Sequence, residues 1–152
     1  MTDRSMPRIV VTTEDIDVGA ELAALEAGAG AVASFVGVVR GEADGRRLTS
    51  LILEHYPAMT EASLAEIAKT AANRWQLTGC TIIHRVGELT PGDRIVLAAA
   101  ASAHRADALA ATAFLIDWLK TDAPFWKREN FADGASHWVS ARDEDQEARN
   151  RW

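Results

Sequence analysis

The chain has 152 residues, a formal net charge of -6 and a single cysteine, and these numbers exclude several classes of protein. An acidic chain is not expected to carry the basic face that binds nucleic acid, and one cysteine cannot form an internal disulfide. No apolar run approaches the roughly 20 residues of a membrane-spanning helix, and the N-terminus has no apolar signal segment. We therefore expect one cytoplasmic domain over residues 1–152, with a polar tail from about residue 143, and neither a nucleic-acid nor a membrane partner.

The first half of the chain predicts three strands and one helix. Residues 9–12 form a β-branched run typical of a strand, and residues 17–27 carry apolar side chains at helical spacing. Residues 31–39 are apolar and rich in valine, which indicates a buried strand. Residues 41–47 are polar and contain two glycines, so we expect a loop before the alternating strand pattern of residues 48–56.

The middle of the chain predicts a helix followed by a hairpin. Thr60 is a good N-cap residue, so we expect a helix over residues 60–75. Residues 80–89 and 94–101 have strand character, and the sequence Thr-Pro-Gly-Asp between them is a strong turn signal. The two strands are therefore predicted to pair with each other.

The last third predicts a long helix and two short strands. Ser102 is expected to cap a helix over residues 103–121, which Pro124 prevents from continuing. Strands are expected over residues 125–131 and 137–141. The order β-α-β-β-α-β-β-α-β-β predicts an α+β fold with a mostly antiparallel sheet of paired strands and about three helices.

Lysine is rare in this sequence, and its positions are informative. Of the 16 lysines and arginines only three are lysines, and two of these, Lys120 and Lys127, flank the segment Pro124–Trp126. If the bend at the proline holds the two amines together, each lowers the pKa of the other, which is a route to a reactive amine. The alternative is a lysine at a helix C-terminus and a solvated strand lysine, on either side of an aromatic core contact.

Two further places could bind an anion. His104 and Arg105 open the long helix, where the helix dipole disfavours cations, and a bound anion would compensate. The alternative is that both side chains point to solvent or pair with an acid such as Asp107. Arg40 follows the buried strand that contains Phe35, and it suits bidentate binding of phosphate or carboxylate. A lone arginine at a strand end is, however, more often a surface residue.

No motif points to a metal or a nucleotide cofactor. The sequence has no HExxH, no paired cysteines, no GxGxxG and no Walker loop. His55 and His84 lie in strand patterns, where a position in the core or on the sheet surface is the ordinary interpretation. We therefore expect no bound metal and no cofactor.

Several strings resemble the molybdopterin synthase catalytic (large) subunit family. They are SFVGVVRG (34–41), LEHYPAMTEASLAEI (53–67), IHRVGELTPGD (83–93), SAHR (102–105), LKTDAPFWKRE (119–129) and HWVSAR (137–142). The resemblance implies an α+β protein that forms a homodimer, in which each protomer binds a small ubiquitin-like sulfur-carrier subunit with a C-terminal Gly-Gly thiocarboxylate. Two carrier molecules in turn would supply the sulfurs that convert cyclic pyranopterin monophosphate, a pterin phosphate, into molybdopterin.

The resemblance also implies residue roles, in a pocket that draws on both protomers. The family's essential lysines fall on Lys120 and Lys127, and we expect Lys127 to be the principal catalytic residue and Lys120 to orient the thiocarboxylate. The expected substrate-binding residues are Arg40, His104 and Arg105, with Phe35, Arg128 and Arg142 as supporting candidates. Val38 and Ile116 depart from the family, because many members carry lysine and methionine there.

Two other functions compete with this enzyme. The first is a module that docks a ubiquitin-like carrier or an anionic metabolite without turnover. The second is a scaffold dimer that uses its aromatic residues only for assembly. Lys127→Ala separates the enzyme from the docking module, because the enzyme should lose product formation while it still binds the carrier. The scaffold dimer predicts that the carrier tail does not bind, which a calorimetric titration would test.

Overall fold

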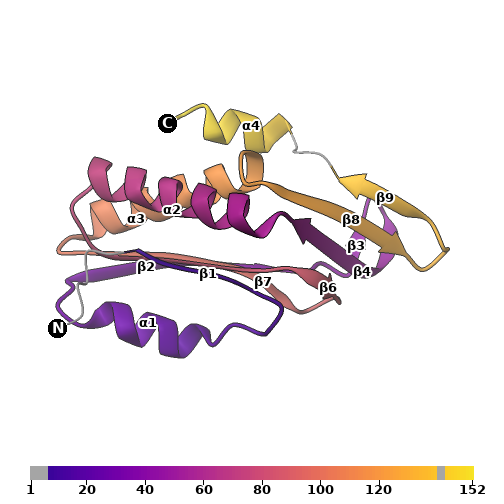
Figure 1. The fold of residues 1–152 in the computed structure, drawn as a ribbon, viewed down its shortest axis with the longest axis horizontal. Coiled ribbons are helices and arrows are strands. Elements are labelled where there is room, and N and C mark those ends of the chain that lie inside the picture. Colours follow the sequence, from indigo (N-terminus) through magenta and orange to yellow (C-terminus); the bar gives the residue numbers. More distant parts are fainter. Residues whose placement is uncertain (1–6, 140–142) are drawn as a thin grey trace.

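The strands of the computed structural model form two sheets. The structure describes residues 7–139 and 143–152. The first sheet has four strands, in the order β1 (Arg8–Thr12), β5 (Leu77–Arg85), β7 (Arg94–Ser102) and β2 (Ala31–Val38). β1 runs parallel to β5, and the other neighbours are antiparallel. Figure 1 shows this sheet as a long layer with α1 (Val18–Glu26) on one face and α2 (Pro57–Arg74) and α3 (Arg105–Thr121) on the other.

The second sheet extends beyond the helices at one end of the molecule (Figure 1). Its strands lie in the order β3 (Glu42–Ala43), β4 (Arg46–His55), β8 (Phe125–Phe131) and β9 (Ser136–Val139), and β6 (Gly87–Leu89) also pairs with β4. All pairs in this sheet are antiparallel. The predicted α+β class with mostly antiparallel pairing is therefore confirmed.

The main core lies between the first sheet and the helices α2 and α3. Leu64 and Ile67 of α2 and Phe114 and Leu115 of α3 are almost completely buried, and Ile82 of β5 packs in the same cluster. Apolar residues three and four positions apart form one face of a helix, so each helix presents a continuous apolar stripe to the sheet. This packing fixes α3 along its length and so determines where its last turn ends.

The polar tail forms a fourth helix, α4 (Asp143–Arg149), which packs on α3 (Figure 1). The Arg149 guanidinium lies 2.6 Å from the Asp122 carboxylate, and the Trp152 indole donates to Asp117 at 2.6 Å. The Trp152 ring also packs edge-on against Phe114. The tail is thus attached to the end of α3. No helix in the described part of the chain is long and apolar enough to cross a membrane.

Both long helices begin at other residues than predicted. α2 begins at Pro57, three residues before Thr60, because the fixed φ of proline suits the first turn of a helix. The Thr60 side chain is buried, and its hydroxyl donates to a backbone carbonyl at 3.0 Å. Ser102 ends β7 and its hydroxyl also donates to a backbone carbonyl, so α3 begins at Arg105 with His104 as its N-cap residue.

Two strand boundaries also differ from the prediction. Residues 41–47 are not all loop, because β3 and the start of β4 pair there across Asp44 and Gly45. These two residues have φ values of 54° and 74°, and positive φ at both central positions is typical of a type I′ hairpin turn. The predicted strand over residues 80–89 is divided before Gly87, whose φ is 91°, and its two parts belong to different sheets.

Gly30 sets the distance between the start of β2 and the residues before α3. A Cβ atom on Gly30 would lie 2.0 Å from the carbonyl oxygen of Ala103, and the Gly30 N–H donates to the Ser102 carbonyl at 2.9 Å. Gly30→Ala is therefore expected to lower the free energy of unfolding by about 2 kcal/mol, because the two segments must separate. Chemical denaturation would measure the change.

The matched control is Gly19→Ala in α1, where the nearest atom, a carboxylate oxygen of Asp17, lies 3.9 Å from the added Cβ. We expect this change to leave the free energy of unfolding unchanged or raise it by up to about 1 kcal/mol, because alanine suits a helix better than glycine. Equal stabilities for the two variants would contradict the proposed role of Gly30.

Candidate active site

A cleft of about 850 Å³ lies where the two sheets meet the end of α3. Its walls come from β2 and the residues after it, the last turn of α3, β8 and β9. Phe35, Arg40, Lys120 and Lys127 all line this hollow, which we call the lysine cleft. Folding therefore brings four of the predicted site residues, from three separate segments, to one place.

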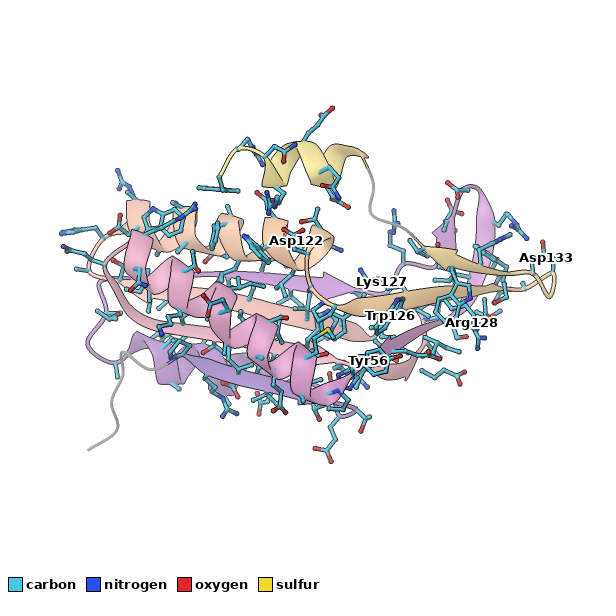
Figure 2. The ribbon with its side chains drawn as sticks, turned by 45° about the horizontal axis from the view of Figure 1, so that its top comes forward. Tyr56, Asp122, Trp126, Lys127, Arg128 and Asp133 are labelled. Carbon is cyan, nitrogen blue, oxygen red and sulfur yellow. The ribbon has the colours of Figure 1, made fainter. Side chains whose placement is uncertain are left out.

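Lys127 faces the lysine cleft because of its position on β8. Side chains of a strand alternate between its two faces, so Lys127 shares one face with Phe125 and Glu129, and all three line the cleft. Trp126 and Arg128 belong to the other face (Figure 2). Antiparallel pairing with β4 on one side and β9 on the other holds this register.

The surroundings of Lys127 favour its neutral form. The pKa of Lys127 is lowered to about 8, chiefly by burial and also by the positive charge of Lys120, whereas Asp145 and Glu129 act in the opposite direction. Taking an ammonium group out of water costs free energy, which is why burial is the largest cause. A lysine with a pKa near 8 is partly neutral at neutral pH, and only the neutral amine can act as a base or nucleophile.

Lys120 reaches the cleft from the last turn of α3. The helix ends at Thr121, and the N–H of Asp122 still bonds to the Trp118 carbonyl at 2.8 Å. Pro124 follows, and the chain then enters β8 at Phe125. This helix end and proline bend place both lysines in one cleft, which is the first of the two arrangements that the sequence left open.

His84 also lines the lysine cleft. It lies on β5, is 4% exposed, and its ring stacks on Phe125 with the ring centres 3.8 Å apart. Its Nδ1 lies 2.7 Å from the carbonyl oxygen of Arg85, so this nitrogen must be the one that donates. The sequence predicted a core or sheet position for His84, and only the meeting of two sheets places it in the cleft.

The other predicted residues on this end of the molecule divide between two faces. Arg40 is exposed and lines the cleft, and Phe35 lies deeper along β2. Arg128 points to the opposite face of β8, where its guanidinium lies 5.7 Å from the centre of the Trp138 ring. Arg142 lies outside the described residues.

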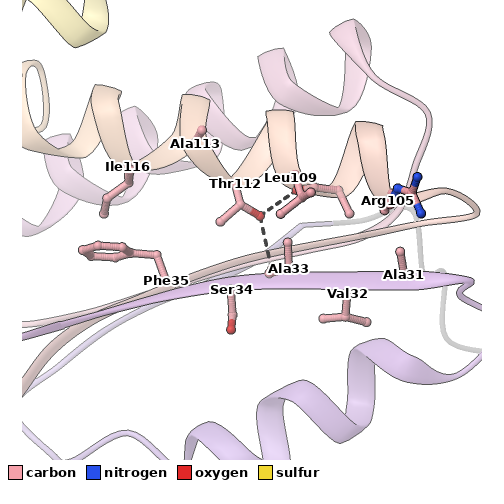
Figure 3. Close-up of a pocket in the computed structure, with 11 residues that line it drawn as sticks. Ala31, Val32, Ala33, Ser34, Phe35, Arg105, Leu109, Thr112, Ala113 and Ile116 are labelled. Atoms are coloured by element: carbon pink, nitrogen blue, oxygen red, sulfur yellow. Dashed lines mark hydrogen bonds between the residues drawn. The ribbon is translucent and has the colours of Figure 1, made fainter.

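His104 and Arg105 lie far from the lysines of the same chain. They open α3, and Lys120 lies near its end, so at 1.5 Å per residue about 22 Å of helix separates Arg105 from Lys120. Arg105 instead lines a second cavity of about 470 Å³ between β2 and α3. Figure 3 shows this groove, with Arg105 at one end and Phe35 and Ile116 at the other. One chain alone therefore does not gather all the predicted substrate-binding residues.

Several cleft residues escaped the sequence analysis. Glu129 and Asp145 bring negative charge to the cleft, and Arg46 and His137 line its outer end. The Arg46 guanidinium lies 2.7 Å from Asp133 and 3.0 Å from His137. These residues belong to β4, β8, β9 and α4. Glu129 and His137 lie within the strings that resemble the family, but the pairing of strands, and not their local sequence, brings all four to the cleft.

The sequence and the fold are similar to those of a known family. The chain matches the model of the MoaE protein family over residues 11–122. It belongs to this family. The molybdopterin synthase catalytic subunit of Ralstonia nicotianae is 53% identical over 150 residues, which cover 97% of this chain and 85% of that protein.

Solved structures of MoaE proteins share the fold. The molybdopterin biosynthesis MoaE protein of Burkholderia ambifaria superposes with a TM-score of 0.82 at 47% identity, covering 97% of this chain and 98% of that one. The molybdopterin synthase of Staphylococcus aureus gives a TM-score of 0.79 at 33% identity, covering 92% and 98%. The predicted family is therefore confirmed, and with it the predicted role of the chain as an enzyme of molybdenum cofactor biosynthesis.

Proposed function

We propose that this chain transfers sulfur from the C-terminal thiocarboxylate of a small ubiquitin-like carrier protein to cyclic pyranopterin monophosphate, and that two such transfers yield molybdopterin. The observation that carries this proposal is the lysine cleft, where Lys127 has a lowered pKa and Lys120 lies beside it. A negatively charged acyl-sulfur group is the kind of reactant that two amines can bind and activate.

The single cysteine supports an external source of sulfur. Cys80 lies on β5 in the main core and is 4% exposed. Burial raises the pKa of its thiol to about 12, and a protonated, buried thiol is a poor nucleophile. The sulfur is therefore expected to arrive on a partner, and the open lysine cleft would receive the end of that partner.

The two lysines would have different roles. Neutral Lys127 would accept a proton and assist attack on the acyl carbon or the pterin. Lys120 would donate N–H bonds to the thiocarboxylate and stabilise the negative charge that develops during transfer. Arg40, at the edge of the same cleft, would bind the substrate phosphate.

A second copy of the chain would complete the site. His104 and Arg105 lie at the far end of α3 from the lysines, so we propose that they act on the cleft of the other protomer of a homodimer. The groove between β2 and α3 supports this, because it is largely apolar and Leu109 on its rim is 59% exposed. An exposed apolar groove of this kind is typical of a surface that a partner covers.

A reconstitution assay tests the proposal. The purified chain is mixed with the thiocarboxylate form of the carrier and with cyclic pyranopterin monophosphate, and molybdopterin is measured as pH is varied. We expect kcat/KM to rise with pH and to reach half of its plateau near the pKa of Lys127, about 8, because the neutral amine is the active form.

The carboxylate form of the carrier is the control and is expected to give no product. The carrier's binding is measured in parallel by calorimetry. Binding of the carrier without any product at any pH would identify the chain as a docking module. If the chain does not bind the carrier, the result would support the scaffold dimer, whose role is assembly alone. Either result would reject the proposed reaction.

A further inference from the structure

His84 is the one buried titratable group that lines the lysine cleft without a role in the proposed reaction, within residues 7–139 and 143–152. A position packed against an aromatic ring would ordinarily be filled by a leucine or phenylalanine, since burying a polar ring costs free energy. Here the cost is partly offset, because Nδ1–H donates to the Arg85 carbonyl at 2.7 Å. The second ring nitrogen, Nε2, is not needed for that bond.

The tautomer of His84 follows from its contacts. A carbonyl oxygen can only accept, so the proton of the neutral ring resides on Nδ1, and Nε2 carries a lone pair. Stacking on Phe125, with 16° between the ring planes, fixes the orientation of this lone pair. The ring is therefore a hydrogen-bond acceptor that cannot rotate freely.

The charges around His84 keep it neutral. Burial is the largest cause that lowers the pKa of His84, the hydrogen bond to the Arg85 carbonyl acts in the opposite direction, and Lys127, Lys120 and His55 also lower it; together they bring the pKa to about 3. Lys127 in turn is influenced by Lys120, Asp145 and Glu129. His84 is therefore neutral at any pH where Lys127 titrates, and it adds a neutral acceptor to the cleft that the two amines line.

We propose that His84 is a positioning residue for Lys127: its Nε2 accepts a hydrogen bond from the Lys127 amino group and fixes the direction of the amine during sulfur transfer. Phe125 and Lys127 lie on the same face of β8, so the strand that stacks on the imidazole also carries the amine. This inference rests on the proposed function, and it gives the buried imidazole a reason that packing alone does not supply.

Three substitutions separate the acceptor from the packing. His84→Phe keeps the stacked ring and removes both nitrogens. His84→Asn keeps a donor close to the position of Nδ1, and His84→Gln places an amide oxygen close to the position of Nε2. His55→Asn is the matched control, because the His55 ring also lies near Phe125, with the ring centres 6.1 Å apart, and its Nδ1 lies 3.1 Å from the Thr60 hydroxyl.

Two measurements are made on each variant. The first is kcat as a function of pH in the reconstituted assay. The second needs no substrate: the pH dependence of acetylation of Lys127 by acetic anhydride, followed by mass spectrometry of its peptide, gives the pKa of that amine. Loss of an acceptor is expected to lower this pKa, because hydrogen bonds to a charged donor are stronger than those to a neutral one.

We expect His84→Phe and His84→Asn to lower kcat about tenfold and to shift the titration of Lys127 to lower pH, while His84→Gln and His55→Asn stay within about threefold of the unsubstituted chain. A merely structural role would lower the melting temperature without moving the titration. If His84→Phe does not fold, the comparison of His84→Asn with His84→Gln still tests whether an acceptor at the position of Nε2 is needed.

Two outcomes would overturn the inference: an unchanged Lys127 titration in both His84→Phe and His84→Asn, or a His84→Gln variant as impaired as His84→Asn. Failure of the proposed function is distinguishable from both. In that case the unsubstituted chain makes no molybdopterin, and the acetylation measurement still decides whether His84 acts on Lys127.

Discussion

Replacing Lys127 by methionine is expected to abolish molybdopterin formation and, at the same time, to stabilise the fold. Removing a group that transfers protons in the transition state costs roughly 100-fold to 10,000-fold in rate. Methionine keeps the length and the apolar stem of lysine, so the wall of the cleft stays filled. The affinity for the carrier protein, measured by calorimetry, is expected to change little, because most of its docking surface is untouched.

The gain in stability follows from the pKa of Lys127. The value is lowered from 10.5 to about 8 by burial, so the unfolded state binds a proton more tightly than the folded state. At pH 7 the folded protein therefore bears nearly the full cost of a buried ammonium, about 3 kcal/mol. The cost diminishes as pH rises from about 8 to 10.5, so the difference between the variant and the parent chain should narrow over that range.

Lys69→Met is the matched control, because Lys69 is the third lysine and is exposed on α2. Lys69→Met should leave the rate of product formation unchanged. It should change the free energy of unfolding by no more than about 0.5 kcal/mol. A Lys127→Met protein that retains full turnover would remove Lys127 from the mechanism. If Lys127→Met is less stable than the parent chain at pH 7, the contacts of the Lys127 ammonium must stabilise the folded state by more than its burial costs.

The second prediction with a large effect concerns the sharing of one site by two chains. A heterodimer of one Lys127→Met chain and one Arg105→Ala chain is expected to be active, although each variant alone is strongly impaired. One of its two sites combines both lysines of one chain with His104 and Arg105 of the other, and is intact. Such a dimer, purified through two different tags, should show roughly half of the parent activity per dimer.

The matched control pairs a Lys127→Met chain with a Lys120→Met chain. Both lysines of a site come from one chain, so each site in this heterodimer lacks one lysine and activity should stay low. Recovery in the first heterodimer and not in the second supports a site built from two chains. If the heterodimer of Lys127→Met and Arg105→Ala assembles normally but is inactive, Arg105 does not act on the cleft of the other chain.

The predicted order of elements was largely correct, because it depends on local patterns. The valine-rich strand before Arg40, the proline bend between Lys120 and Lys127, and the helical spacing of α2 and α3 are all properties of neighbouring residues. The same local information left two arrangements of the lysines open, and the structure shows that both line one cleft. The residues between them are few, and a helix end, a proline and a strand leave little freedom for their relative position.

What local patterns could not decide is which surfaces face each other. The face of β8 that carries Lys127 became the inner one through its register with β4, and the same register directed Arg128 outward. His84 entered the cleft only because the predicted long strand divides before Gly87, so that β5 and β6 pair with different partners. Long-range pairing, and not periodicity, selects these contacts.

The sequence by itself thus determined the family, which continuous strings of residues identify, and the α+β class, which follows from the order of the elements. It also singled out the two lysines and placed His104 and Arg105 at the opposite end of one helix. Tertiary structure alone decided that His84 lies in the lysine cleft and that Arg105 lines a separate groove between β2 and α3. The physical reason is that the distance along a rigid helix, about 1.5 Å per residue, follows from the sequence positions, whereas strands distant in sequence become neighbours only through long-range pairing.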